Sequence, residues 1–418
     1  MAKKVQEILK QVLAGIRPSK QDEKLVVEKV NGVIRKLNKN LRGAKAQLGG
    51  SGAKGTWLKS FDADVFVTFN YSKYKDKGAE LSDILEKTVR RSFTKYDRIH
   101  GSRDYFQVKL DGFTVEIVPI LAIKKAKEAR NITDVSLLHV AWVKRHRKLA
   151  DEIRLAKQFC KAAKVYGAES YIRGFSGYVV EILVIYYDGF LKLARAAAKW
   201  KDKEVIDAAR HYRNKNEIMF ELNKAKLVSP LIVIDPVQKD RNAAASISKE
   251  KFEQFKAACK AFLARQSAEL FEVKEFDRNE LEKRKGKNIL VLVKATAESG
   301  KRDIVGSRLL KVFEFLGGQI VKNDFKIIEK GWDWNKEAIF WFIVDSKELE
   351  TYRVHEGPLL KSKVHVERFK TAHEETFVKG NRIYAKVKRK YTKVQALVND
   401  MIKDKYVSER VKRVWIER

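Results

Sequence analysis

The chain has 418 residues, 44% hydrophobic and 10% aromatic, which is enough for about three globular domains. Its 88 Lys and Arg against 54 Asp and Glu give a net charge of +34. This excess favours a polyanionic partner, with a surface adapted to high salt or heat as the alternative. Cys160 and Cys259 are the two cysteines, so a disulfide framework is excluded and a cytoplasmic location is expected. The most apolar stretch, 179–187, contains Glu181 and is too short to cross a bilayer, so no membrane partner is expected.

The first 135 residues are predicted to form a small α/β domain. After Pro18 and Ser19, apolar residues recur at helical spacing through 25–41, and a glycine-rich bend follows at 49–52. Alternation of polar and apolar residues then predicts strands over 62–69, 107–110 and 114–120.

The remainder of the chain is predicted to be first helical and then mixed. Helices are expected over 151–164, 177–193, 203–213 and 249–264. The charged segment 274–288 is predicted to be a linker, followed by strands at 289–293 and 339–344 with a helix at 308–316 between them. The expected fold class is therefore α+β and multidomain, with an α+β module and a basic segment at the C-terminal end.

Three carboxylates in the predicted strands point to metal chemistry. Residues i and i+2 of a strand point to the same face, so Asp62 and Asp64 place two carboxylates side by side. Glu116 lies in a second apolar strand. Adjacent carboxylates repel each other unless a cation lies between them, and Mg²⁺ prefers one or two carboxylates together with substrate phosphates. The alternative is a solvated pair of acids on an exposed strand face.

The Gly50-Ser51 bend, the acid-x-acid strand and the later single acid together resemble the polymerase-β nucleotidyltransferase superfamily. The resemblance implies a polymerase-β-like α/β head in which Asp62, Asp64 and Glu116 are catalytic and bind two Mg²⁺ ions. It also implies that the Gly-Ser turn meets a phosphate group.

Longer motifs resemble one family within that superfamily, the archaeal-type CCA-adding enzymes. These motifs are residues 50–57, 131–139, 166–178 and 235–245. The resemblance implies a catalytic head over 1–135, a helical, nucleotide-binding neck over 136–265, an α+β body over 266–350 and a basic tRNA-binding tail over 351–418. It further implies addition of C, C and A to a tRNA 3′ end from CTP and ATP without a template, with contacts to the acceptor stem and T-arm.

Further site residues follow from the same resemblance. Ser51 and Lys54 would contact the triphosphate, and Arg241 would select the base. Phosphates and ribose would be bound by Ser136, His139, Lys157 and Tyr166. Each has a structural alternative: a packed histidine at 139, a solvated lysine at 157, a core tyrosine at 166, and an Arg241 paired with Asp235 or Asp240.

The basic C-terminal segment supplies the predicted RNA contacts. Arg382, Lys386 and Lys388 alternate with aromatic residues there, which is typical of a phosphate-binding surface, although these side chains could simply keep the protein soluble. Two departures from the family are visible: Glu116 stands where Asp is usual, and segment 100–105 does not align with the family's histidine- and aromatic-containing segment. A poly(A) polymerase, an oligoadenylate synthetase-like enzyme and an inactive RNA-binding relative remain alternatives, and a homodimer is left open.

Overall fold

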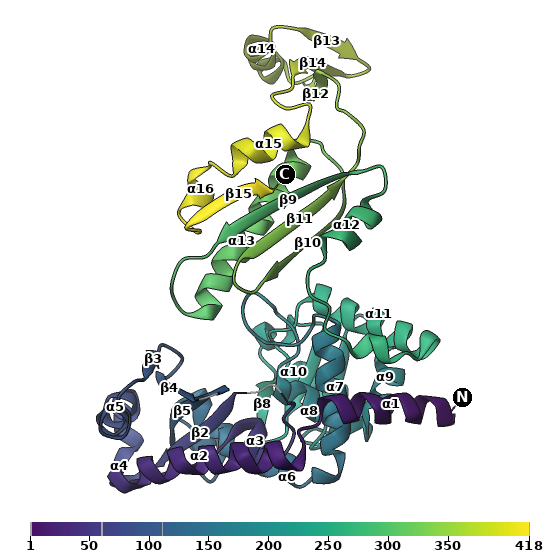
Figure 1. Ribbon diagram of the computed structural model, residues 1–418. Helices are drawn as coiled ribbons and strands as arrows, with labels where there is room; N and C mark the ends of the chain where they lie inside the picture. The colour runs from purple at the N-terminus through teal and green to yellow at the C-terminus, as the bar shows by residue number, and fades with distance from the viewer. Residues whose placement is uncertain (1, 60–61, 111, 418) are drawn as a thin grey trace. The chain divides into compact units, whose positions relative to one another are not determined.

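The computed structural model describes residues 2–59, 62–110 and 112–417. It divides into two compact units, Met1–Lys274 and Glu275–Arg418, each of which is described by itself (Figure 1).

The first unit contains a five-stranded mixed sheet in the order β1-β2-β5-β4-β3. Strands β2 and β5 are parallel, and the other neighbouring pairs are antiparallel. The strands are β1 (Ala44–Leu48), β2 (Ala63–Phe69), β3 (Asp97–Ile99), β4 (Tyr105–Leu110) and β5 (Phe113–Leu121). Helices α2 (Lys20–Asn40) and α5 (Leu81–Ser92) bury their apolar faces against the same core as the sheet. On the other face, Phe66 and Ile120 pack with Val140 of α6 (Ser136–Lys144).

The helical part of the first unit shares one large core rich in phenylalanine. It is formed by α1 (Ala2–Ile16), α7 (Ala150–Ala162), α8 (Gly177–Tyr187), α9 (Phe190–Ala197) and α11 (Lys249–Arg265). Helix α1 contributes Val5, Leu9 and Val12 to this core. The first helix of the chain therefore packs with the helical part and not with the five-stranded sheet.

Two predicted helices of this region are wrong in the structure. The helix expected over 177–193 is two helices, because Asp188 and Gly189 have φ angles of 55° and 122°, which no α-helix can contain. The segment 203–213 contains a strand, β6 (Glu204–Asp207), which pairs in parallel with β7 (Leu231–Asp235). Strand β8 (Gln238–Asn242) completes this three-stranded sheet, and α10 (Lys215–Glu221) lies between β6 and β7 in the sequence.

The second unit has a four-stranded antiparallel sheet in the order β10-β11-β9-β15. Its strands are β9 (Ile289–Thr296), β10 (Ile327–Trp334), β11 (Ala338–Val344) and β15 (Arg413–Glu417). Helices α13 (Arg302–Lys322) and α15 (Val394–Met401) share its core. The linker predicted at 274–288 contains a helix, α12 (Arg278–Lys285), whose Leu281 is buried against the sheet.

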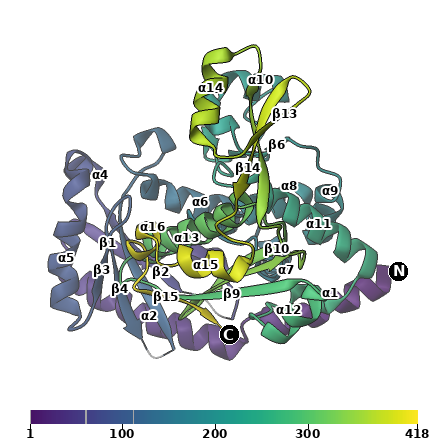
Figure 2. The same ribbon diagram turned by 90° about the horizontal axis from the view of Figure 1, so that it is seen from above.

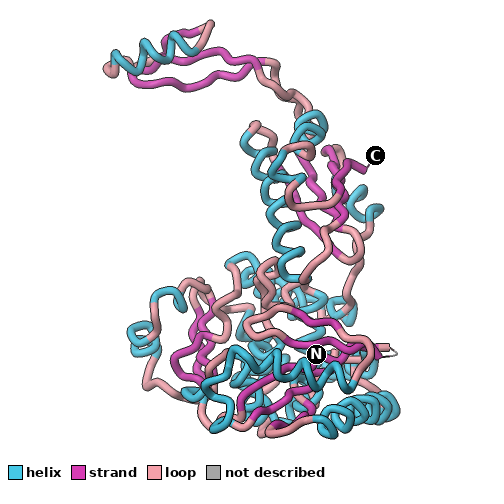
Figure 3. The backbone as a smooth tube through the Cα atoms, turned by 90° about the vertical axis from the view of Figure 1, so that its left-hand side faces the viewer, coloured by secondary structure: helices cyan, strands magenta, loops and turns pink. Residues whose placement is uncertain are grey.

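A separate three-stranded antiparallel sheet, β12-β14-β13, follows β11 in the sequence (Figures 2 and 3). It consists of β12 (Tyr352–Leu359), β13 (Thr376–Lys379) and β14 (Arg382–Lys388), with α14 (Lys363–Ala372) beside it. The segment 351–418 thus divides between two sheets, because the chain returns through α15 and α16 (Lys405–Ser408) to form β15.

Candidate active site

The three predicted catalytic acids come from neighbouring strands of the five-stranded sheet. Asp64 of β2 pairs directly with Glu116 of β5, and Asp62 immediately precedes β2. Asp64 and Glu116 lie on the same sheet face as Phe66 and Ile120, because side chains alternate along a strand. The structure therefore brings Asp64 and Glu116 together on the face that packs against α6.

Mutual repulsion and burial govern the charges of these acids. Burial and then Glu116 raise the pKa of Asp64 to about 7. Burial and Asp62 raise the pKa of Glu116 against the opposing hydrogen bond from Gln107, whose Nε2 lies 2.8 Å from Glu116 Oε1. Burial and the same acids also raise the pKa of Tyr105 to about 12. The acids thus form one negatively charged region that a cation would stabilise.

These acids could supply only some of the ligands of a divalent ion, and other groups would have to complete its coordination. Among the residues that the structure describes, no three His, Cys, Asp or Glu side chains gather into a ready-made metal cluster. Mg²⁺ usually takes one or two carboxylates and completes its shell with water and substrate phosphates. The paired carboxylates of β2 and β5 match that requirement, because they leave the remaining positions to the substrate.

The Gly-Ser bend lies directly against the acid strand. Gly49 N–H donates to Asp64 O at 2.7 Å, and a Cβ at Gly50 would lie 1.6 Å from Asp64 Oδ2. Gly50 also has a φ of 49°, so position 50 requires glycine both for its backbone and for this close approach. Ser51 follows within the short helix α3 (Gly50–Lys54).

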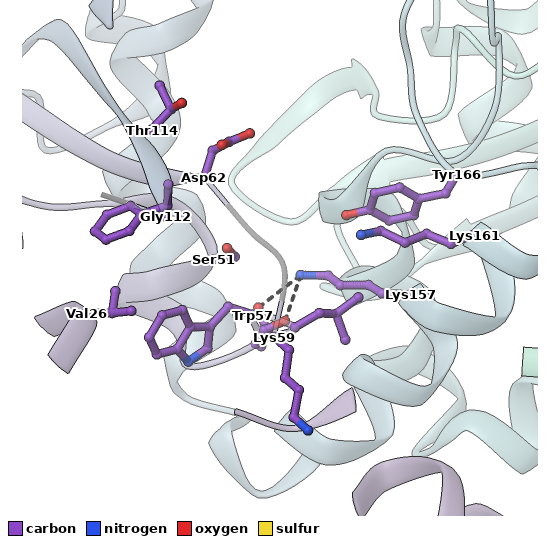
Figure 4. Close-up of a pocket in the computed structure, with 13 residues that line it drawn as sticks. Val26, Ser51, Trp57, Lys59, Asp62, Gly112, Thr114, Lys157, Lys161 and Tyr166 are labelled. Atoms are coloured by element: carbon purple, nitrogen blue, oxygen red, sulfur yellow. Dashed lines mark hydrogen bonds between the residues drawn. The ribbon is translucent and has the colours of Figure 1, made fainter. Parts of the chain in front are cut away.

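A pocket of about 520 Å³ opens beside Asp62 (Figure 4). Ser51, Asp62 and Thr114 come from the part of the unit that contains the sheet. Lys161 of α7 and Tyr166 face them from the helical part, with the amine and the hydroxyl directed toward Ser51 and Asp62. The Asp62 carboxylate and the Lys161 amine therefore lie on opposite walls of one pocket.

Tyr166 reaches the pocket because the facing helix begins with a glycine. A Cβ at Gly177, the first residue of α8, would lie 2.7 Å from the Tyr166 hydroxyl oxygen. Burial raises the pKa of Tyr166, so its hydroxyl stays protonated and can donate a hydrogen bond.

Lys54 and Lys157 share one buried carboxylate, Glu181 of α8. Lys54 Nζ donates to Glu181 Oε2 at 2.7 Å, and Lys157 Nζ donates to Oε1 at 2.8 Å. The Thr56 hydroxyl also donates to Oε1, at 2.7 Å. Burial would raise the pKa of Glu181, but Lys157 and Lys54 together lower it to about 2. This cluster ties the chain after α3 to α7 and α8.

His139 and Arg241 also meet at one buried carboxylate, Asp235. His139 Nε2 lies 3.0 Å from Asp235 Oδ2, and Arg241 donates to the same oxygen at 2.6 Å. Tyr178 stacks on the His139 ring at 3.9 Å and donates to Asp235 Oδ1 at 3.1 Å. Burial would raise the pKa of Asp235, but its contacts with His139 and Arg241 lower it to about 2. The alternative pairing of Arg241 with Asp235 is therefore present in the structure.

Ser136 is the first residue of α6 and is half-buried. The segment before it is fixed by Asp134, which is fully buried and accepts hydrogen bonds from Arg103 at 2.5 Å and from Leu121 N at 2.9 Å. Arg103 also donates to Pro119 O at 3.1 Å. The segment 100–105 that could not be aligned thus supplies an arginine that joins the end of β5 to the start of α6.

The sequence motifs indicate no role for Glu181, Arg103, Asp134 or Lys161. Glu181 is a lone acid in an otherwise apolar helix. A buried charge requires partners, so this position could have indicated a buried ion pair. Nothing local in the sequence indicates that its partners are Lys54, Thr56 and Lys157.

Arg382, Lys386 and Lys388 lie on one face of the β12-β14-β13 sheet. The other face carries His355 and Ala385, which are register partners, and Phe369 of α14 packs on the His355 ring. The face that α14 does not cover combines cations with aromatic rings. Phe377 and Tyr384 stack at 5.7 Å, and Lys386 lies 4.9 Å from the centroid of Tyr352.

The fold of the first unit is that of a nucleotidyltransferase. A cytoplasmic RNA terminal U-transferase aligns with 66% of this chain and all of its own, with a TM-score of 0.52 at 15% identity. A poly(U) polymerase aligns with 64% of this chain and 98% of its own, with a TM-score of 0.51 at 15% identity. A nucleotidyltransferase domain model matches residues 27–139. Two further family models match: the second domain of tRNA nucleotidyltransferase at 151–272 and the C-terminal domain of the CCA-adding enzyme at 285–415.

The chain belongs to the CCA-adding enzymes, as its full-length relatives show. The CCA-adding enzyme of Nanoarchaeum equitans is 34% identical over 90% of this chain and 92% of its own length. That of Methanocaldococcus jannaschii is 30% identical over 95% of this chain and 91% of its own. The resemblance to the archaeal type and the prediction of a nucleotidyltransferase are therefore confirmed. Among the described residues, no helix is long and apolar enough to cross a membrane.

Proposed function

We propose that this chain adds C, C and A in sequence to the 3′ end of tRNA, taking CTP and ATP as substrates and using no nucleic-acid template. In each step the terminal 3′-hydroxyl attacks the α-phosphate. The new O3′–P bond forms as the bond to the β-phosphate oxygen breaks, the hydroxyl proton is lost and pyrophosphate leaves. The proposal rests chiefly on two observations: Asp64 and Glu116 are register partners on β2 and β5, and the pocket lined by Asp62 also carries Lys161 and Tyr166 from the helical part.

Asp62, Asp64 and Glu116 are proposed to bind two Mg²⁺ ions. When bound, these ions would lower the pKa of the 3′-hydroxyl and offset the charge of the leaving pyrophosphate. Gln107 on the neighbouring strand β4 donates a hydrogen bond to Oε1 of Glu116, so this longer side chain is held in place. That contact supports a working ligand at position 116 despite the departure from the usual Asp.

The remaining residues are proposed to position the nucleotide. Ser51, Lys157 and Tyr166 border the pocket, and their groups suit phosphates and ribose. Lys54 is linked to Lys157 through Glu181, so the two lysines and the carboxylate together carry one net positive charge. Ser136 and His139 belong to α6, and Arg241 is proposed to hydrogen-bond the base edge from its position on Asp235.

Product lengths test this function directly. A tRNA lacking its end should gain two cytidines and then one adenosine when CTP and ATP are supplied, and addition should then stop. Sequencing gels of reactions with each nucleotide alone and in combination measure this. A long adenosine homopolymer would point to the poly(A) polymerase alternative, and no addition at all to the inactive RNA-binding relative.

The uncovered face of the β12-β14-β13 sheet is proposed to bind the acceptor stem and T-arm of the tRNA. Its cations can bind phosphates, which supply affinity independent of sequence, and its aromatic rings can stack on exposed bases. The ion pairs of Arg382 with Glu356 and Lys386 with Glu375 are exposed, so little energy opposes their exchange for phosphates.

Replacing Arg382, Lys386 and Lys388 with Ala should weaken tRNA binding and reduce its salt dependence. Each lost phosphate contact removes about 0.7 to 0.9 from the slope of log affinity against log salt, so the slope should fall by roughly two to three units. The measurement is tRNA affinity at several salt concentrations.

A matched control removes the same charge from α14, through Ala at Lys363, Arg368 and Lys370. That helix lies on the opposite sheet face, so its variant should keep a salt slope close to that of the original chain. Equal slopes for the original chain and the β14 variant would contradict the proposed binding face.

A further inference from the structure

Tyr178 of α8 lies between the two buried carboxylates, Glu181 and Asp235. Its hydroxyl donates to Asp235 Oδ1 at 3.1 Å, and its ring stacks on the His139 ring with the centroids 3.9 Å apart. Lys54 Nζ lies 5.2 Å from the centroid of the same tyrosine ring. Lys54 is bound to Glu181, which follows Tyr178 by three positions on α8 and therefore lies on the same helix face. Tyr178 thus contacts a member of each charged cluster.

The Asp235 carboxylate is saturated with hydrogen-bond donors. Oδ1 accepts from the Tyr178 hydroxyl and from Val237 N–H at 3.0 Å, and Oδ2 contacts His139 Nε2 and Arg241 Nη1. An ionised carboxylate has about four lone-pair positions and acts only as an acceptor. Burial and Asp235 raise the pKa of Tyr178, so its hydroxyl keeps its proton and remains a donor. These contacts together fix the orientation of the fully buried Asp235 side chain.

The orientation of Asp235 in turn sets the direction of the Arg241 guanidinium. Among the residues that the structure describes, Arg241 hydrogen-bonds to Asp235 alone, from Nη1 to Oδ2 at 2.6 Å. A guanidinium carries its five N–H donors in one plane, so the others stay available to a ligand. The Arg241 side chain is 29% exposed, which leaves those donors accessible. Any rotation of the Asp235 carboxylate would therefore turn them.

We propose that Tyr178 is a positioning residue that determines which base is accepted, because it holds Asp235 so that the remaining donors of Arg241 face the base edge. The inference rests on the proposed function, in that Arg241 hydrogen-bonds the base. Tyr178 itself does not touch the nucleotide. Without its hydroxyl, Oδ1 of Asp235 would keep Val237 N–H as its donor, and the carboxylate would be free to turn. A site that recognises hydrogen-bonding groups discriminates strongly only while its own groups are correctly oriented.

Tyr178→Phe in the full chain tests this proposal, because phenylalanine keeps the ring beside His139 and Lys54 and removes the hydroxyl. The ratio of kcat/KM for CTP to that for UTP should fall by about tenfold or more, as expected for loss of a hydrogen bond to a charged group. The ratio for ATP to GTP, measured on a tRNA that lacks its final adenosine, should fall similarly. Inhibition by tripolyphosphate and affinity for tRNA should stay unchanged.

Unchanged ratios in Tyr178→Phe would overturn the proposal even if the variant were less stable, because lost stability alone does not alter the choice among nucleotides. Tyr187→Phe is the matched control. Tyr187 lies on the same helix, and its hydroxyl accepts a hydrogen bond from Trp200 Nε1 at 3.1 Å. Its ratios should equal those of the original chain.

Arg241→Ala tests the route by which Tyr178 acts. If Tyr178 works through Arg241, adding Tyr178→Phe to Arg241→Ala should lower the ratios no further, because the two residues form one coupled unit. A further fall by the full factor seen in Tyr178→Phe alone would show that the two act independently, and the proposal would be wrong.

Affinities for α,β-methylene analogues of the four nucleotides separate this inference from the proposed function, because these analogues cannot be added. Calorimetry with Mg²⁺ and a tRNA lacking its end measures them. If the original chain added no C or A but Tyr178→Phe narrowed the differences in affinity, the function would fail and the role of Tyr178 would stand. If CCA addition were normal and the ratios unchanged in Tyr178→Phe, the Tyr178 assignment alone would fail. An inactive original chain with no preference among the analogues would overturn both.

Discussion

Asp64→Ala should abolish nucleotide addition, lowering the rate by about a thousandfold or more, while tRNA affinity stays close to that of the original chain. Asp64 lies beside Glu116 and against the Gly-Ser bend, so its loss removes a proposed metal ligand at the centre of the proposed site. Metal-ion catalysis contributes several kcal/mol, and each 1.36 kcal/mol corresponds to about tenfold in rate. Single-nucleotide addition under saturating CTP measures the effect.

Two further variants keep this prediction specific. Asp64→Asn preserves the packing against Gly50 and should be nearly as inactive as Asp64→Ala, because the charge is what the metal requires. Asp76→Ala, at an exposed position in the same unit, should retain full activity. Addition by Asp64→Ala at a tenth of the normal rate would show that Asp64 is not a metal ligand.

Glu181→Gln should destabilise the first unit by about 3–5 kcal/mol at neutral pH, the usual cost of breaking a buried ion pair. The substitution keeps the size of the side chain but leaves the ammonium groups of Lys54 and Lys157 without their shared negative charge. Chemical denaturation monitored by tryptophan fluorescence measures the loss.

The same variant has a defined pH dependence. The pKa of Glu181 is about 2 in the folded chain against an ordinary value of 4.5, so its stabilisation is present above pH 4.5 and is lost as the pH falls toward 2. The difference between the original chain and Glu181→Gln should therefore shrink in that window. Glu250→Gln, at an exposed residue in the first turn of α11, should show no such difference. An equal difference at pH 3 and pH 7 would contradict the role of the charge.

The strands that carry the candidate acids could be predicted because their signals are local. Alternating apolar residues place Asp64 and Glu116 in strands, and each strand was recognised within one or two residues of its ends. That these two residues are direct register partners depends on strand order, which the alternation does not contain.

The two shared carboxylates could not be predicted for a related reason. Glu181 meets Lys54 across 127 positions of the sequence, and Asp235 meets His139 across 96. Such contacts follow from how helices and sheets pack in three dimensions. Local periodicity also failed where a short strand resembled a helix: Val205 and Ile206 fit either pattern, and the positive φ of Arg210 excludes a helix through 210.

The β12-β14-β13 sheet and α14 form an insertion in the second unit, since the chain leaves after β11 and returns to place β15 against β9. The ends of the insertion meet where Arg389 N–H donates to Thr351 O at 2.7 Å, and the Arg389 side chain pairs with Asp324 at the end of α13. The two ends of the insertion are therefore adjacent. Residues between 351 and 389 could be deleted and the ends joined by a short turn. Truncation at residue 350 would be a different experiment, because it also removes β15 and leaves the edge of β9 open to association with other chains.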